Sequence, residues 1–506
     1  MMALFPRVTT SSLRLLFCVV CISAPLAAPA GGQVAAGGDE GVALAITDEG
    51  IRHRTDFLAS DALQGRDTPS PGLEAAAAYI VSEMRRMGLE PGGEGGTYYQ
   101  RYPFFRRQLD LQGVVVEIEG PAGTVTLALG EDYFVTGGTD GVLSAPVVMQ
   151  PNEPDGDGAV MAFSLPGAWD GAFRGVAGQQ LREAQGMGAV AVVHLLDESW
   201  GEGQVSQLVT FSSQPSWTLG SELPFPQVYI RTGAAERALV QAGFDVDAVT
   251  EGRQSPTSRI TLPRPALEEA FPPNVAAIVR GSDPQLRNEY VILSAHMDHV
   301  GVGQPVNGDS IYNGADDNAS GTSGLMEVAR VLSAADRKPA RSVLLLWVSG
   351  EEKGLLGSRW YSDHPTVPVE AIAANVNVDM IAGDQHADSV VVIGKDYSSL
   401  GDLVNRVNAR HPELDLIASD DIWPEQRFFF RSDHFNFARL EIPAIFFFTG
   451  VHECYHRPCD DLEFVDPHKA ARVANLILQT VVEIANDPER PSWIPAGLEE
   501  VRALTR

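Results

Sequence analysis

Residues 290–299 read YVILSAHMDH, an apolar run that ends in two histidines and an aspartate, and similar runs recur along the second half of the chain. Residues 342–352 (SVLLLWVSGEE) end in two glutamates, and residues 374–379 (ANVNVD) end in an aspartate. Near-continuous apolar runs that alternate with helical segments predict an α/β fold whose sheet is covered on both faces. The expected strands are residues 275–279, 290–295, 342–348, 374–378, 389–393 and 444–448, and the expected helices are residues 321–334, 355–363, 400–409 and 467–485.

Reactive side chains gather at one edge of this predicted sheet, because sites in open α/β sheets form beyond the carboxyl ends of the strands. Four expected strands are followed by such residues, namely His296, Asp298 and His299; Glu351 and Glu352; Asp379; and His452 and His456. A loop before a helix adds Asp316 and Asp317. Imidazoles mixed with carboxylates suit zinc, and two histidines with three carboxylates fit two ions that share one carboxylate.

The residues alone leave the individual roles open. The shared carboxylate is Asp316 or Asp317, since both stand at the start of a helix. One of Glu351 and Glu352 binds metal, and the other takes the proton of a metal-bridging water, because adjacent residues project in different directions. Each motif alone is weak, and an Asp-Asp-Asn turn is usually only a turn. The argument depends on their coincidence at one sheet edge.

Composition narrows the class of protein. The chain has 506 residues and a formal net charge of −29, with 44% hydrophobic and 20% charged residues, which is typical of globular proteins. The excess of carboxylates argues against nucleic-acid binding, which depends on Lys and Arg. Soluble globular behaviour with carboxylates free to bind cations is therefore expected.

The first thirty residues have the pattern of an export signal. Arg7 and Arg14 precede the apolar run 15–22 (LLFCVVCI), and residues 28–30 (APA) supply a small-x-small cleavage pattern. The run is shorter than the about 20 residues that cross a bilayer, so we expect no stable membrane insertion after cleavage. The sequence thus predicts a secreted or periplasmic protein, and an oxidising compartment favours a disulfide between Cys454 and Cys459.

The combination of motifs resembles the secreted co-catalytic zinc aminopeptidases of metallopeptidase family twenty-eight, which also includes glutamate carboxypeptidase II and glutaminyl cyclases. The matching segments are AHMDHVG (295–301), IYNGADDNASGTSGLMEVAR (311–330), VSGEEKGLLGS (348–358), NVNVDMIAG (375–383), RSDHFNF (431–437) and CYHRPCDD (454–461). The opening segment, from LASDALQGRDTP onward, also resembles the family. Residues 178–199 (GQQLREAQGMGAVAVVHLLDES), within a Gly- and Pro-rich region that we interpret as an inserted, mainly β domain, resemble a protease-associated domain.

The resemblance implies roles for individual residues. Two Zn²⁺ ions would share Asp317, one with His296 and Asp379 and the other with Glu352 and His456. Glu351 matches the general base, Asp298 would orient the imidazole of His296, and Tyr455 would donate a hydrogen bond to the oxyanion. The implied domains are a signal peptide (1–30), a flexible leader (31–43), the first part of a peptidase domain (44–136), a protease-associated insertion (137–262), the main peptidase part with the di-zinc site (263–490) and a C-terminal tail (491–506).

The implied function is an exported zinc exopeptidase that removes N-terminal amino acids from peptide substrates. The alternatives are a dipeptidase or carboxypeptidase of the same fold, a glutaminyl cyclase, or a catalytically dead binding protein; the complete ligand set and Glu351 argue against the last. The aromatic residues Trp423, Phe428, Phe429 and Phe430 either pack in the core or line a specificity pocket. Arg431 could contact a substrate carboxylate, and Asp433 and His434 are expected near the site.

Overall fold

The computed structural model describes residues 42–137, 141–149, 156–167, 172–212, 214–383 and 388–505. The predicted export signal and residues 31–41 of the predicted leader lie outside these ranges. Within them, no helix combines the length and the apolar character that a membrane crossing requires.

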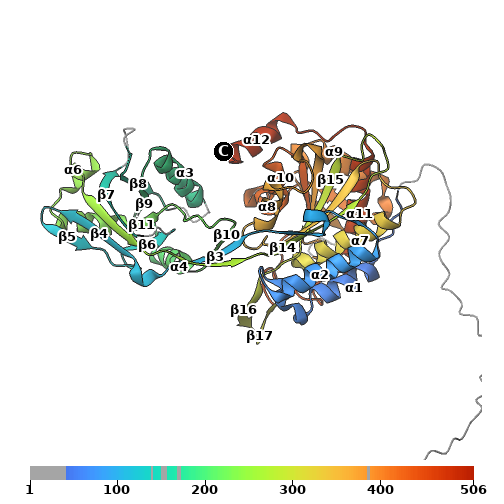
Figure 1. Ribbon diagram of the computed structural model, residues 1–506, viewed down its shortest axis with the longest axis horizontal. Coiled ribbons are helices and arrows are strands. Elements are labelled where there is room, and N and C mark those ends of the chain that lie inside the picture. Colours follow the sequence, from blue (N-terminus) through green and yellow to red (C-terminus); the bar gives the residue numbers. More distant parts are fainter. Residues whose placement is uncertain are drawn as a thin grey trace, which may run out of the picture. The chain divides into compact units, whose positions relative to one another are not determined.

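The central sheet is built around four parallel strands that lie side by side in the order β18-β15-β19-β22. Figure 1 labels β15 at its centre. These are β18 (Ser342–Val348), β15 (Tyr290–His296), β19 (Ile372–Val378) and β22 (Ala444–Phe448). Antiparallel pairing surrounds this centre, because β14 runs opposite to β18 and β20 runs opposite to β22. The outer strands are β14 (Pro273–Val279), β1 (Glu90–Pro91), β2 (Tyr99–Arg101), β20 (Ser389–Ile393) and β21 (Ile417–Ser419). The predicted α/β sheet flanked by helices is confirmed; it is a mixed sheet, in which parallel pairing joins the four central strands and also β20 to β21 at one edge.

Successive residues of the central strands face two different hydrophobic cores. Val291, Leu293 and Ala295 belong to one core, whereas Ile292 belongs to the other. The first core is formed with α1 (Asp48–Leu58), α2 (Pro71–Arg86), α7 (Gly321–Ala334), α9 (Leu400–Arg410) and α11 (Pro467–Asn486). The second is formed with α8 (Leu356–Asp363) and α10 (His434–Ala438). Burial on both faces explains why these strands read as continuous apolar runs.

The four predicted helices of this domain match α7, α8, α9 and α11 to within one residue at each end. Local chemistry fixes the start of α11. Pro467 occupies its first turn, and the Asp466 carboxylate accepts hydrogen bonds from the backbone N–H groups of His468 and Lys469. An aspartate N-cap followed by proline is a strong start signal, which is why the sequence predicts this boundary well.

A second sheet contains strands from residues 115–262, in the order β5-β4-β12-β7-β8-β9-β11-β6. Its strands are β4 (Val115–Gly120), β5 (Gly123–Thr126), β6 (Tyr133–Thr136), β7 (Gly141–Met149), β8 (Val160–Leu165), β9 (Ala191–Leu196), β11 (Gln227–Arg231) and β12 (Thr257–Leu262). The predicted boundary at residue 137 does not coincide with the boundary between the sheets, because β4, β5 and β6 pair within this second sheet. Their alternating pattern is visible in the sequence, but the pattern does not say which sheet a strand joins.

This region also contains more helix than predicted. The helix expected near residues 178–185 is α3 (Ala172–Gly186), and three further helices are α4 (Glu202–Ser212), α5 (Thr232–Gln241) and α6 (Val246–Thr250). In α5, Ala234 and Ala238 lie four residues apart and pack into the second sheet's core. A short helix with small apolar residues gives only a weak periodic signal. The predicted C-terminal tail likewise holds a helix, α12 (Pro495–Thr505), whose Val501 is buried.

A hairpin not predicted from the sequence connects the HMDH segment to the Asp317 loop. It consists of β16 (Gly301–Val306) and β17 (Asp309–Tyr312), and its turn residues Asn307 and Gly308 both have positive φ, at 53° and 94°. An Asn-Gly turn of this kind is typical of tight hairpins. The base of the hairpin lies against Gly65, where a Cβ atom would come within 2.3 Å of the Tyr312 carbonyl oxygen. Only glycine permits this approach, which brings the neighbouring Arg66 close to the sheet edge.

Candidate metal centre and active site

The parallel strands bring the predicted ligands to one end of the sheet. His296 is the last residue of β15 and pairs with Val348 at the end of β18, so Glu351 and Glu352 follow at the same edge. Asp379 directly follows β19. Asp317 lies in the loop before α7, and His456 lies in the loop after β22. This is the edge at which an open α/β sheet forms its site.

Asp317 stands between the two histidines. Its Oδ1 atom is 3.3 Å from His296 Nε2, and its Oδ2 atom is 3.2 Å from His456 Nε2. His296 Nε2 is also 3.1 Å from Asp379 Oδ1, while His456 Nε2 is 3.0 Å from Glu352 Oε2. Each imidazole therefore faces its own second carboxylate, and Asp317 offers one oxygen to each group, as a carboxylate shared by two ions must.

Asp316, the other candidate for the shared position, points elsewhere. Its Oδ1 accepts hydrogen bonds from the Ala382 N–H at 2.7 Å and from the Ser320 hydroxyl at 3.0 Å, and its Oδ2 is 3.4 Å from His452 Nε2. Asp316 and His452 thus form a buried pair of their own, and the arrangement favours Asp317 as the shared carboxylate.

The donor set fits metal ions. His456 Nε2 and Glu352 Oε1 are buried and take part in no hydrogen bond among the described residues, although oppositely polar atoms lie about 3 Å away. Buried polar atoms are ordinarily hydrogen-bonded. Nitrogen and carboxylate atoms that face one another without hydrogen-bond geometry are suited to coordinate a common cation, and imidazole with carboxylate is a donor set that zinc accepts.

One residue of this cluster was not assigned from the sequence. His299 lies with its Nδ1 atom 2.9 Å from Glu352 Oε1, and it forms a candidate metal-binding group with Asp317, Glu352 and His456. The only signal for it was its place directly after a strand, in the same segment as His296.

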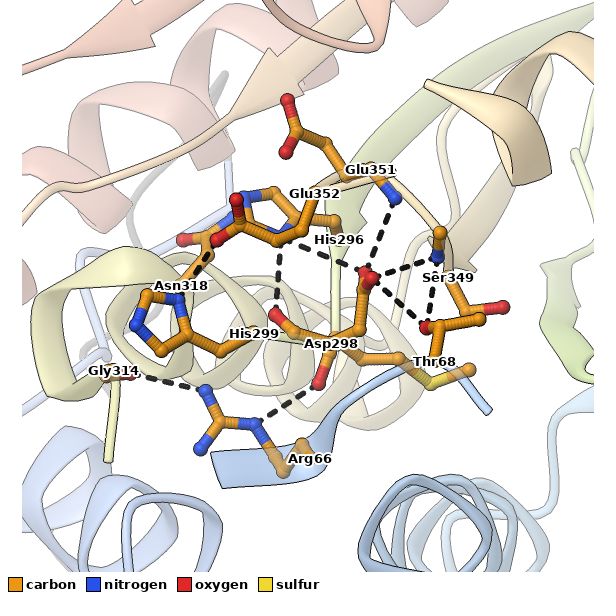
Figure 2. Close-up of polar contacts among 12 residues, drawn as sticks. Arg66, Thr68, His296, Asp298, His299, Gly314, Asn318, Ser349, Glu351 and Glu352 are labelled. Atoms are coloured by element: carbon orange, nitrogen blue, oxygen red, sulfur yellow. Dashed lines mark hydrogen bonds and ion pairs between the residues drawn. The ribbon is translucent and has the colours of Figure 1, made fainter. Parts of the chain in front are cut away.

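The Asp298 carboxylate contacts both the backbone of the Glu351 segment and, at a longer distance, the imidazole of His296 (Figure 2). Its carboxylate accepts hydrogen bonds from the Thr68 hydroxyl at 2.9 Å and from the N–H groups of Gly350 and Glu351 at 2.8 and 3.4 Å. Its nearest oxygen is 3.8 Å from His296 Nδ1, which lies closer, at 3.2 Å, to the Asp298 carbonyl oxygen. Asp298 therefore holds the turn that carries both glutamates, and its orientation of the His296 imidazole stays a prediction.

Glu351 lies in neither group of potential ligands but lines the same pocket as His296, Asp317, Asp379 and Tyr455. Removal from bulk water raises the pKa of Glu351 well above its ordinary value, and the neighbouring Glu352 carboxylate adds to this effect. A carboxylate with a raised proton affinity beside a group of potential metal ligands is suited to accept a proton.

Tyr455 packs flat on the imidazole of His456, with ring centroids 3.9 Å apart. Burial and the nearby carboxylates raise the pKa of its hydroxyl above the usual value. The phenol therefore stays protonated at neutral pH and keeps a hydrogen to donate into the pocket, as its predicted role requires.

A buried arginine that was not assigned from the sequence stabilises the backbone next to the site. The Arg66 guanidinium donates to the carbonyls of Met297 at 3.0 Å and Asn313 at 2.7 Å, and also to that of Leu58. Figure 2 shows its further hydrogen bond to the Gly314 carbonyl, at 3.0 Å. Burial lowers its pKa to about 10, so it remains charged. It ties the end of β15 to the loop that precedes Asp317.

Of the four aromatic residues considered for a specificity pocket, only Phe428 lines the pocket, together with Phe446, Phe448, Val451 and Arg431. Trp423 packs edge-on against Phe428 and Phe448 as support. Phe429 and Phe430 pack on neighbouring aromatic rings instead.

The RSDHF motif contributes support around this pocket. Ser432 was not assigned from the sequence, yet its hydroxyl donates to Asp379 Oδ2 at 2.8 Å and so orients that carboxylate. His434 packs between the rings of Phe429 and Phe446, and burial lowers its pKa to about 3. Burial also raises the pKa of Asp433 to about 7.

The predicted disulfide between Cys454 and Cys459 is confirmed, and it spans the loop that carries His456. His456 has a positive φ of 54°, a conformation that a non-glycine residue adopts only when its surroundings impose it.

We predict that Cys454→Ser lets this loop relax and weakens zinc at the His456 position, by roughly the 10–100-fold typical of losing a residue that orients a ligand. Zinc competition titration of the oxidised full chain measures the effect. Cys459→Ser should behave in the same way, and unchanged zinc affinity in both variants would contradict the prediction.

Comparisons with known proteins agree with this architecture. The family model described as "Peptidase family M28" matches residues 274–481. A probable leucine aminopeptidase of Arthroderma benhamiae is 27% identical over 221 residues, which cover 42% of this chain and 58% of that protein. Aminopeptidase YwaD of Bacillus subtilis is 25% identical over 258 residues, covering 49% and 52%. The chain thus spans about half the length of these curated relatives.

An aminopeptidase structure from Aneurinibacillus sp. shares the fold, with a TM-score of 0.51 and 20% identity over 88% of this chain and 95% of that one. The matched segment 274–481 contains the five predicted ligands and Glu351, so the resemblance to peptidase family M28 covers the whole predicted metal centre.

Proposed function

We propose that this protein is a zinc-dependent aminopeptidase that hydrolyses N-terminal amino acids from peptides. The observation that carries the proposal is the position of Asp317, whose two oxygens face His296 and His456 while a carboxylate without a ligand role, Glu351, lies beside them. Relatives named as aminopeptidases support the same reaction class.

In this proposal, individual residues of the chain have separate roles in hydrolysis. Bound zinc supplies Lewis-acid polarisation of the scissile carbonyl and acidifies a water molecule. Glu351 accepts the proton of the attacking water and passes it to the leaving amine. Tyr455 donates its phenolic hydrogen to the oxygen that becomes negative in the tetrahedral intermediate. Asp298 keeps Glu351 in place through the backbone N–H groups of its turn.

We also propose that the protein is exported and that residues 137–262 contain a protease-associated insertion. The pattern of the first thirty residues supports export, and so does the disulfide, which is typical of oxidising compartments.

The aminopeptidase proposal is tested with pairs of peptides that differ only in a free or an acetylated amino end. We expect hydrolysis of the free peptides alone, loss of activity on chelation and recovery on addition of zinc. Release of the carboxyl-terminal residue from acetylated peptides would show carboxypeptidase action instead, and no hydrolysis by the zinc-loaded protein would refute the proposal.

One observation favours a second candidate, a dipeptidase of the same fold. Arg431 lines the pocket beside Asp379 and Glu351, with its guanidinium 4.7 Å from the centre of the Phe428 ring. Among the described residues no carboxylate forms an ion pair with Arg431, so its charge is available to a substrate carboxylate.

If Arg431 binds the carboxylate of a dipeptide, kcat/KM for a dipeptide should exceed that for its C-terminal amide, and Arg431→Met should remove the preference. A hydrogen-bonded charge is worth about 1.5–3 kcal/mol, or roughly 10–100-fold. Arg427→Met is the matched control, because Arg427 lies over Phe430 rather than in the pocket lining. Equal kcat/KM values for the dipeptide and its amide would exclude the dipeptidase candidate and leave the aminopeptidase proposal as the one supported.

A further inference from the structure

We propose that His299 is a fourth protein ligand, through Nδ1, at the metal position formed by Asp317, Glu352 and His456. The inference rests on the proposed zinc-dependent function, but it assigns to this chain a ligand beyond the five predicted from the sequence. Its consequence is that the two metal positions are unequal.

The His299 ring lies next to all three of the other potential ligands. Its Nδ1 atom is 2.9 Å from Glu352 Oε1 and 3.7 Å from Asp317 Oδ2, and its ring meets that of His456 edge-on at 5.5 Å. One ligand atom from each of the four residues lies within 4.8 Å of all the others. Four donor atoms this close to one another are near enough to bind one ion together.

The ring nitrogens of His299 also lack the hydrogen bonds that a buried imidazole ordinarily forms. Both ring nitrogens of His299 are buried without a hydrogen-bond partner among the described residues, and so is Glu352 Oε1. A buried imidazole next to a carboxylate would ordinarily donate to it. Here the two atoms approach to 2.9 Å without the geometry of a donor and an acceptor, which is the relationship of two ligands to a common cation. His456 Nε2 has the same property.

The backbone provides the space that this ring needs. Gly314 has a φ of 62°, and a Cβ atom there would lie 2.4 Å from His299 Cγ and 2.5 Å from its Cδ2. The Gly314 carbonyl in turn accepts a hydrogen bond from Arg66 (Figure 2). The His299 imidazole is therefore closely packed against the loop that carries Asp317.

The two positions then differ in donor number and type. His296, Asp317 and Asp379 offer one nitrogen and two carboxylates, whereas the second group offers two nitrogens and two carboxylates. Since zinc favours imidazole nitrogen and four-coordinate sites, the position with His299 should fill first. Zinc loading of the full chain should consequently proceed in two resolved steps.

The test is zinc titration of the full chain against a chromophoric chelator, with cobalt(II) as a spectroscopic substitute. In the wild type we expect two equivalents, the first bound more tightly. In His299→Ala the first step should weaken at least 10-fold and approach the second, and the visible spectrum of the first cobalt equivalent should change. His364→Ala is the control, because His364 is exposed and belongs to neither group.

Two further comparisons separate a ligand role from a merely structural one. Metal-free His299→Ala and metal-free wild type should unfold at similar temperatures, and if the alanine variant fails to fold, His299→Asn replaces it in the same titration. A wild type that binds no zinc would refute the proposed function itself. A wild type with two zinc ions and a His299→Ala variant with the same affinities and cobalt spectrum would overturn this inference alone.

Discussion

Glu351→Gln is expected to abolish peptide hydrolysis while both zinc positions remain filled. Glu351 lines the pocket but belongs to neither group of ligands, so its amide replacement should leave metal binding intact. An amide cannot accept the proton of the attacking water, and general-base catalysis contributes about 10²–10⁴-fold. The fall in kcat for an aminoacyl-p-nitroanilide, together with zinc content by elemental analysis, measures both parts of the expectation.

The neighbouring glutamate supplies the matched control. Glu352 faces His299 and His456, so Glu352→Gln should reduce zinc content and lose activity for that reason. The two variants separate a proton-transfer role from a ligand role within one turn of the chain. Full activity of Glu351→Gln would rule out the general-base assignment, and loss of zinc in Glu351→Gln alone would reverse the roles of the pair.

The sequence predicted the central sheet well for a physical reason. Its strands are buried on both faces, so nearly every position is apolar, and the runs 290–295, 342–348 and 374–378 end shortly before polar site residues. The same property predicts that His296, Glu352 and Asp379 lie at one edge of the sheet. Strand order and register were not needed for this step, because parallel strands all end on the same side.

The contacts that hold the site could not be predicted in the same way, because they join segments far apart in the chain. Thr68 donates to Asp298 across 230 residues, and Arg66 donates to Gly314 across 248. Ser432 reaches Asp379 from the bend that precedes the short helix α10, a segment with no periodic pattern of its own. His299 was visible in the sequence, but only distances to Glu352 distinguish it from an ordinary buried histidine.

Residues 115–262 show the opposite case, in which the local sequence pattern underestimates the helix content. Short helices such as α5 occur in a segment where Gly and Pro are frequent, and these residues are read as turns. Packing of Ala238 and Leu239 against the second sheet stabilises α5, and that packing is a tertiary effect absent from the local sequence. Propensity alone therefore underestimated the helix content.

Asp317→Asn is expected to weaken zinc at both positions at once. Each oxygen of Asp317 faces a different histidine, and an asparagine keeps only one oxygen and carries no charge. The loss should exceed the roughly 10–100-fold that follows removal of a residue that only orients a ligand. Chelator competition should show both binding steps displaced, with activity lost in parallel.

Asp316→Asn is the adjacent control for this prediction. Asparagine keeps the oxygen that accepts from Ala382 and Ser320, and the pair with His452 lies outside both ligand groups. Both zinc ions should therefore remain, and any cost should appear in thermal stability rather than in metal affinity. If Asp316→Asn lost both ions while Asp317→Asn kept them, the shared carboxylate would be Asp316, and the pairing of one oxygen with each histidine would have no role in metal binding.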